Sequence, residues 1–173
     1  MKKNRQESLK GAGHWLLSMQ NEDGSFASDF SLRRGRGGKF AEITGYIIPT
    51  LLDLGLKENA RRAGQWLLSV QNRDGWFDFW AKPGAPMVFD TAQTIFGFLS
   101  LYREFSQSQF LTAAQKAGDW IIQQQEEDGS WIKYAYNKIP HTYYARGSWA
   151  LLALWQATGE EKYKNCAIRQ LDW

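Results

Sequence analysis

The composition of the 173-residue chain excludes several classes of protein before any motif is considered. A hydrophobic fraction of 43% with 23% charged residues fits one ordinary globular domain, and a net charge of +3 is too small by itself to indicate nucleic-acid binding. The single cysteine, Cys166, excludes an internal disulfide, which suits a reducing compartment.

The start of the chain, residues 1–7, leads into an amphipathic helix pattern and contains no apolar signal core. No stretch approaches the ~18 consecutive apolar residues of a membrane span. We therefore expect a cytoplasmic protein without a membrane span.

Three segments, residues 12–26, 63–77 and 117–131, align without gaps and define a repeat. Each contains Ala-Gly-x-Trp, two aliphatic residues, a Gln five positions after the Trp, and then Asp-Gly-x-aromatic. The Trp positions 15, 66 and 120 are 51 and 54 residues apart, and a further step of 53 reaches Trp173. This pattern is typical of an amphipathic helix that ends at Asp-Gly, where glycine tolerates a positive φ.

Three other stretches, residues 41–54, 89–102 and 141–157, lie between these copies and are apolar nearly all round. Such stretches are typical of helices that are packed on more than one side. Gly55 and Gly159 are expected to end the first and third of them. Pro49 is expected to kink the first or to be accommodated by a local break.

The connections predict how these helices pair. Each apolar stretch is joined to the next amphipathic helix by a short link, which forces antiparallel hairpins, whereas the long connections 21–39, 72–88 and 126–140 run the other way. We predict an all-α fold of antiparallel hairpin repeats, with amphipathic helices outside and apolar helices inside, forming an arc of about half an α/α toroid.

We expect a single domain over residues 1–173. It would hold three hairpins, at about 6–56, 57–104 and 108–158, and an incomplete fourth outer helix at 160–173. The ring would be completed by missing C-terminal repeats or by a homo-oligomer.

The turn sequence Gln-x-x-Asp-Gly-x-(Phe/Trp) resembles the QW repeats of triterpene cyclases and, more broadly, the terpenoid-cyclase and prenyltransferase superfamily of α/α toroids. The resemblance covers nearly the whole chain and implies the toroid fold. It does not by itself imply an activity, because one fold hosts many functions.

The resemblance also supplies a test for cyclisation. Class II terpene cyclases protonate their substrate with an Asp-x-Asp-Asp-Thr-Ala motif whose middle aspartate is the acid. The matching residues 87–92 read Met-Val-Phe-Asp-Thr-Ala, so that only the last aspartate, Asp90, is kept. The zinc site of a prenyltransferase would need a Cys, His and Asp set, which Cys166, His14 and His141 do not supply. We therefore expect neither protonation-initiated cyclisation nor a metal or other cofactor.

Helix starts such as Phe-Asp-Thr-Ala-Gln and Pro-His-Thr-Tyr are also similar to those of toroid proteins of bacterial polysaccharide metabolism, which include lyases, unsaturated glucuronyl hydrolases and epimerases. In this architecture the N-termini of the inner helices converge on one mouth of the ring. A carboxylate, an imidazole, a phenol and a guanidinium gathered there would supply a base, an acid and an anion clamp. The predicted catalytic residues are Asp90, His141, Tyr144 and Arg146.

The predicted substrate-binding residues are Glu42, Trp76, Trp80, Tyr143, Trp149 and Arg36. Trp76 and Trp80 would stack on sugar rings. Arg36 lies in a loop with four positive charges, which would grip an anion or remain solvated. The simpler alternatives are that Asp90 caps its helix and that Glu42 favours the positive end of its own.

Our main hypothesis is a carbohydrate-active or carbohydrate-binding toroid that acts on an acidic polysaccharide as a lyase, hydrolase or epimerase. Its partner would be an oligosaccharide or another small molecule, not a nucleic acid. The alternatives are an isoprenoid-handling protein that lacks the protonating motif, and a non-catalytic helical-repeat interaction module.

Overall fold

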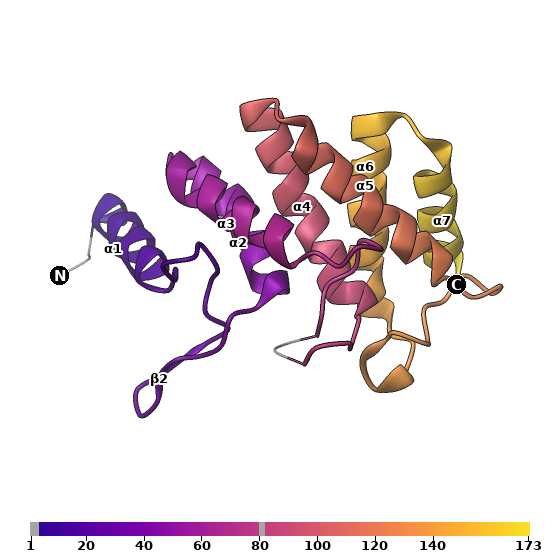
Figure 1. Ribbon diagram of the computed structural model, residues 1–173, viewed down its shortest axis with the longest axis horizontal. Coiled ribbons are helices and arrows are strands. Elements are labelled where there is room, and N and C mark those ends of the chain that lie inside the picture. Colours follow the sequence, from indigo (N-terminus) through magenta and orange to yellow (C-terminus); the bar gives the residue numbers. More distant parts are fainter. Residues whose placement is uncertain (1–3, 80–81) are drawn as a thin grey trace.

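The computed structural model describes residues 4–79 and 82–173, and within them the chain forms an arc of α-helices (Figure 1). The helices are α1 (Arg5–Ser18), α2 (Ala41–Asp53), α3 (Lys57–Val70), α4 (Val88–Phe105), α5 (Ser108–Gln123), α6 (Ala145–Thr158) and α7 (Glu161–Asp172). Two short 3₁₀ helices, η1 (Tyr136–Lys138) and η2 (Thr142–Tyr144), precede α6. None of the helices in this described part is long and apolar enough to cross a membrane.

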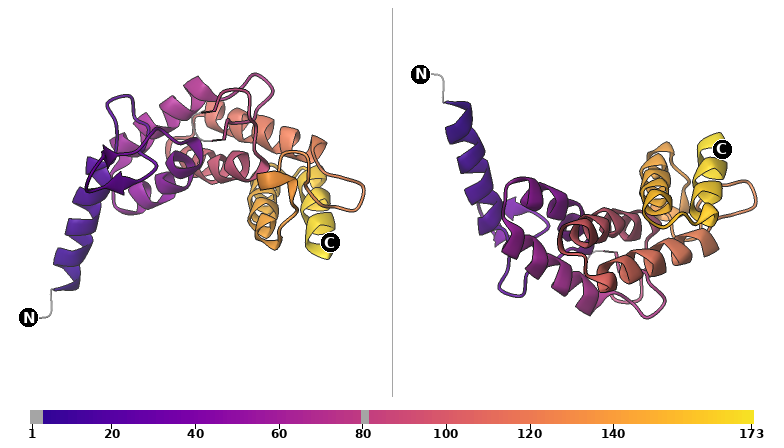
Figure 2. Two further views of the ribbon diagram at one scale, coloured as in Figure 1. Left: turned by 90° about the horizontal axis from the view of Figure 1, so that it is seen from below. Right: turned by 90° about the horizontal axis from the view of Figure 1, so that it is seen from above.

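The helices form two layers. Helices α2, α4 and α6 pack side by side as the inner layer, while α3, α5 and α7 each pack on the inner helix that precedes them. Figure 2 shows the resulting curve, with the two ends of the chain at the two ends of the arc. The structure is a partial α/α toroid, so the predicted fold class is confirmed.

Glycines end two of the inner helices where the sequence pattern predicts it. Gly55 and Gly159 both have a φ of 74°, a left-handed conformation that costs glycine little. Helix α2 runs without a break through Pro49, because the helix continues to Asp53. Of the two expected alternatives at this proline, a kink or a local break, the break is therefore absent.

The repeated turns bind each outer helix to the next. The Gln71 side-chain amide donates to the carbonyl oxygens of Gly75, at 3.0 Å, and of Ala113 on α5, at 2.9 Å. Gly75 has a φ of 104°, and an added Cβ there would lie 2.2 Å from the carbonyl oxygen of Lys116. The same contacts recur between Gln20 and Asn59 and between Gln125 and Cys166. The Gln and Gly of the repeat are therefore part of the scaffold, as are the buried aromatics Phe26, Phe77 and Trp131.

Two local elements differ from the prediction. The third inner helix begins at Ala145 rather than at residue 141, because residues 142–144 form the 3₁₀ turn η2. The long connection 21–39 contains an antiparallel hairpin of β1 (Phe30–Ser31) and β2 (Gly35–Arg36). Gly35, with a φ of 75°, allows the chain to reverse there.

Candidate functional site

The first turns of the three inner helices meet at one end of the inner layer. Glu42 lies in the first turn of α2, Asp90 in the first turn of α4 and Arg146 in that of α6. The charge of Glu42 acts on Asp90, and that of Arg146 acts on Glu42. The structure therefore brings these three predicted residues near one another, and their chemical roles are a separate question.

Asp90 is a buried carboxyl group without a complete set of partners. It is 3% exposed, and its Oδ2 has no hydrogen-bond partner among the described residues. Burial, with a further contribution from the charge of Glu42, raises the pKa of Asp90 to about 8. The carboxyl group is therefore mostly protonated and neutral at pH 7. The N-cap position of α4 is held by Met87, so Asp90 is not the cap of its helix.

Glu42 is less buried than Asp90 and lies beside the same guanidinium. Burial raises the pKa of Glu42, and the positive charge of Arg146 partly opposes that rise. Burial also raises the pKa of Tyr46, one turn further along α2, and the charge of Glu42 raises it further. No ion pair within 4 Å joins Glu42 to Arg146 in the described part of the chain.

Arg146 is held by one hydrogen bond and by two aromatic rings. Its Nε donates to the Oε1 of Gln93 at 2.5 Å, and its guanidinium lies 5.7 Å from the ring centre of Phe96 and 5.5 Å from that of Trp149. The two rings are themselves 4.7 Å apart. Among the described residues neither terminal nitrogen of Arg146 has a hydrogen-bond partner, and the Nε2 of the buried Gln93 also has none. The terminal nitrogens of Arg146, an exposed residue, are therefore available to a ligand, whereas the Nε2 of Gln93 is shielded from solvent.

Beside Arg146 lies an open cavity of about 280 Å³ on the inner layer. Its walls come from all three inner helices and are mainly aromatic and aliphatic, with two guanidinium groups. The lining residues are Tyr46, Pro49, Phe96, Leu99, Ser100, Arg103, Arg146, Trp149 and Ala153. We call this the inner-face cavity.

Only Arg146 and Trp149 of this lining were predicted as site residues. The others follow the helical spacing of three and four residues, as in the series 96, 99, 100 and 103 on α4. That spacing shows which residues share a face, but it does not show which face is left open by the neighbouring helices.

Three other predicted residues form a stack of rings before α6. His141 lies on Tyr143, with ring centres 5.0 Å apart, and Tyr143 lies on Tyr144 at 4.8 Å. Tyr144 is buried, its hydroxyl accepts a hydrogen bond from the backbone N–H of Tyr136, and burial raises its pKa far above the usual range. In its ionised form Asp90 would raise the pKa of Tyr144 further, because the two groups lie close together. His141, on the other side of Tyr143, has no hydrogen bond or ion pair to Asp90 or Arg146 among the described residues.

Of the remaining predicted binding residues, Trp76 and Arg36 make contacts that belong to the scaffold. Trp76 is half-buried and packs against the hydrophobic core, and Trp80 lies outside the described residues. Arg36 donates from its guanidinium to the backbone carbonyls of Ser18, at 3.1 Å, and Gln20, at 3.4 Å. These bonds tie the β1–β2 hairpin to the end of α1, which gives Arg36 a structural contact.

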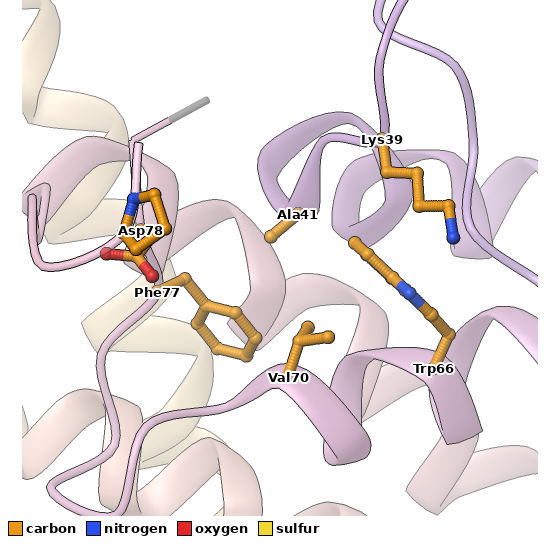
Figure 3. A pocket seen from close by; sticks show the side chains of 7 residues that line it. Lys39, Ala41, Trp66, Val70, Phe77 and Asp78 are labelled. Atoms are coloured by element: carbon orange, nitrogen blue, oxygen red, sulfur yellow. The ribbon is translucent and has the colours of Figure 1, made fainter. Parts of the chain in front are cut away.

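A second cavity, of about 310 Å³, lies between α3 and the loops that precede α2 and α4. Figure 3 shows the Trp66 ring beside Lys39, with Phe77 and Asp78 across from it. Neither Trp76 nor Arg36 is among its described lining residues. No group of three or more His, Cys, Asp or Glu side chains within residues 4–79 and 82–173 is placed to hold a metal ion.

Residues 38–173 match the family described as squalene-hopene cyclase C-terminal domain. The match covers most of the chain and includes all three inner helices. It confirms the resemblance to the terpenoid-cyclase toroids. No curated protein matches the chain.

Proposed function

The chain belongs to the squalene-hopene cyclase C-terminal domain family, and we propose that it binds an isoprenoid with an anionic head group at the inner-face cavity. The observation that supports this most is the combination, in one cavity, of aromatic walls with the guanidinium groups of Arg103 and Arg146. The family is named for a cyclase of squalene, an isoprenoid hydrocarbon. The match therefore favours the isoprenoid alternative, and it gives the carbohydrate hypothesis no support beyond the fold.

The apolar part of the cavity suits a branched hydrocarbon chain. Phe96 and Leu99 from α4 face the same space as Trp149 and Ala153 from α6. Trp149 is 56% exposed, a large apolar area for a residue that lines a cavity. A ligand of apolar character would cover this ring and gain about 25 cal/mol for each Å² of apolar surface removed from water.

The charges in the cavity favour an anion over a cation. Arg146 is not neutralised by an ion pair among the described residues, and its hydrogen-bond partner, Gln93, is uncharged. A unit charge about 6 Å from this guanidinium would interact with it by about 3 kcal/mol at an effective dielectric constant of ~20. That interaction would oppose a carbocation intermediate, whereas it would stabilise a phosphate or diphosphate.

Asp90 is poorly suited to start a cyclisation by protonating a carbon–carbon double bond. An alkene is a very weak base, so its protonation requires a strong acid, whereas burial and Glu42 make Asp90 a weaker acid than a free aspartic acid. With Met87 and Phe89 in place of the other two carboxylates of the cyclase motif, no second acid stands beside it in the sequence. We therefore propose binding without protonation-initiated cyclisation.

Calorimetric titration of the chain with farnesyl diphosphate, farnesol and inorganic diphosphate tests this proposal. A charge-assisted hydrogen bond is worth about 1.5–3 kcal/mol, so farnesyl diphosphate should bind about tenfold or more tightly than farnesol. Inorganic diphosphate should also bind more weakly, because it lacks the apolar chain. Equal affinities for the diphosphate and the alcohol would refute the anionic head group, and an absence of binding by both isoprenoids would refute the function.

Incubation with squalene, followed by mass-spectrometric analysis of the extracted lipids, tests the absence of cyclisation. We expect squalene to be recovered unchanged. A cyclised product that disappears in the variant Asp90→Asn would show that Asp90 is a competent acid and would contradict the reasoning from its raised pKa.

A further inference from the structure

Gln93 is a fully buried polar residue of α4 that the packing of the inner layer does not require. Its side chain is 0% exposed, and its Nε2 has no hydrogen-bond partner among the described residues. A buried N–H group without a partner lowers the stability of a fold. A leucine would avoid this cost, so apolar packing alone does not account for an amide at this position.

The side chain of Gln93 accepts a hydrogen bond that links α4 to α6. Its Oε1 receives the Nε–H of Arg146 at 2.5 Å, although the two residues are 53 positions apart in the chain. Arg146 is exposed, and a guanidinium on a long exposed side chain would otherwise sample many orientations. Because the guanidinium is planar and rigid, a bond at Nε restricts the directions in which its terminal nitrogens point. The buried amide therefore orients an exposed charge.

Two aromatic rings complete this arrangement. Phe96 lies three residues after Gln93 on α4, and Trp149 lies three residues after Arg146 on α6, so each ring shares a helix face with one partner of the hydrogen bond. Phe96, Arg146 and Trp149 all line the inner-face cavity, whereas Gln93 is not among its described lining residues. Gln93 therefore acts on the cavity through Arg146.

Gln93 orients the guanidinium without neutralising it. A carboxylate is the stronger partner for an arginine, and Arg61 is paired in this way with Glu58. The partner of Arg146 is an uncharged amide, and no ion pair within 4 Å joins Arg146 to a carboxylate in residues 4–79 and 82–173. The positive charge of Arg146 is therefore left for a ligand.

We propose that Gln93 is the positioning residue of the inner-face cavity and sets its preference for an anion. Its buried amide holds the Arg146 guanidinium in one orientation, and its neutrality leaves the positive charge to an anionic head group. The identity of the anion rests on the proposed function. The orientation of Arg146 does not, because it can be measured without a ligand.

Nuclear magnetic resonance of the ligand-free chain tests the positioning role. The signal of the Arg146 Nε–H is identified by its loss in Arg146→Lys, and its exchange with solvent is compared between the wild type and two variants of Gln93. We expect exchange to be about tenfold or more faster in Gln93→Leu, because the acceptor is lost. In Gln93→Glu it should stay slow, because a carboxylate oxygen accepts the same bond.

The affinities of the same variants for farnesyl diphosphate and farnesol test the role of neutrality. Gln93→Glu should weaken binding of the diphosphate by about tenfold or more, because the new carboxylate neutralises Arg146 and repels the anion. Gln93→Leu should weaken it by about threefold or more, because the guanidinium must then be ordered by the ligand. Both variants should leave the affinity for farnesol unchanged. Gln123→Glu adds the same charge at an exposed position of α5 and should alter neither affinity.

The outcomes separate this inference from the proposed function. Unchanged exchange of the Arg146 Nε–H in Gln93→Leu would overturn the positioning role. A wild-type preference for the diphosphate that persists in Gln93→Glu would overturn the role of neutrality. If the wild type itself showed no preference for the diphosphate, the anionic head group of the proposed function would be refuted, and the exchange of the Arg146 Nε–H would decide the positioning role by itself.

Discussion

Replacement of Asp90 by asparagine should make the protein more stable, by an amount that depends on pH. The carboxyl group has a pKa of about 8 in the folded chain, against 3.8 in the unfolded chain. Between these values the folded state holds a proton that the unfolded state has released. The free energy of unfolding therefore falls as the pH rises from about 4 to about 8. The contribution of Asp90 to stability is fully present below pH 4 and is lost by pH 8.

The size of the effect follows from the two pKa values. Each pH unit within this interval costs about 1.4 kcal/mol per group, so raising the pH from 4.5 to 7.5 costs the wild-type chain about 4 kcal/mol through Asp90. An asparagine at the same buried position has nearly the same shape and does not titrate. The stabilisation by Asp90→Asn should therefore be about 4 kcal/mol larger at pH 7.5 than at pH 4.5.

Urea denaturation at the two pH values measures this difference, because the unfolding free energy is obtained from each transition. The variant Asp74→Asn, at an exposed aspartate, serves as the control and should behave as the wild type at both pH values. The reasoning would be refuted if Asp90→Asn changed stability by the same amount at pH 4.5 and at pH 7.5.

Two further predictions concern the scaffold. Gln71→Ala removes the side-chain hydrogen bonds to Gly75 and Ala113 and should lower the unfolding free energy by about 1–3 kcal/mol. Urea denaturation measures this change, and an unchanged midpoint would contradict the role of the turn. Gly75→Ala should destabilise by more than the ~1–3 kcal/mol expected of a strained backbone alone, since its Cβ would also overlap the Lys116 carbonyl. Gly55→Ala is its matched control, because an added Cβ there meets nothing within 4 Å, and thermal unfolding should rank the two variants in that order.

The fold could be predicted from the sequence because its determinants are local and repeated. Asp-Gly turns at regular spacing mark the ends of the outer helices, and short links at Gly55 and Gly159 leave no alternative to antiparallel hairpins. The β1–β2 hairpin was missed because two-residue strands carry almost no periodicity. The late start of α6 was missed because Thr142, Tyr143 and Tyr144 are compatible with either type of helix.

The candidate site could be predicted only in part. Glu42, Asp90 and Arg146 come together because they lie in the first turns of three neighbouring inner helices. Tyr46 and Arg103 could not be identified, because it takes the packing of three helices to decide which of their faces remains open. The stacking of His141 on Tyr143, away from Arg146, depends on the path of the chain before α6.

The contact of Arg36 with the carbonyls of Ser18 and Gln20 could not be predicted from the sequence either. A loop rich in arginine and glycine indicates a possible anion site in a sequence. The hairpin that Gly35 permits directs this guanidinium toward the backbone at the end of α1 instead.

The affinity of Arg146→Gln for farnesyl diphosphate and for farnesol tests the central claim most directly. The account predicts that this variant weakens binding of the diphosphate by about tenfold or more and leaves binding of the alcohol unchanged, since only the anion gains from the guanidinium. Arg73→Gln, at an exposed position outside the inner-face cavity, should alter neither affinity. An equal loss for both ligands, or no loss for either, would contradict an anion-binding role for Arg146.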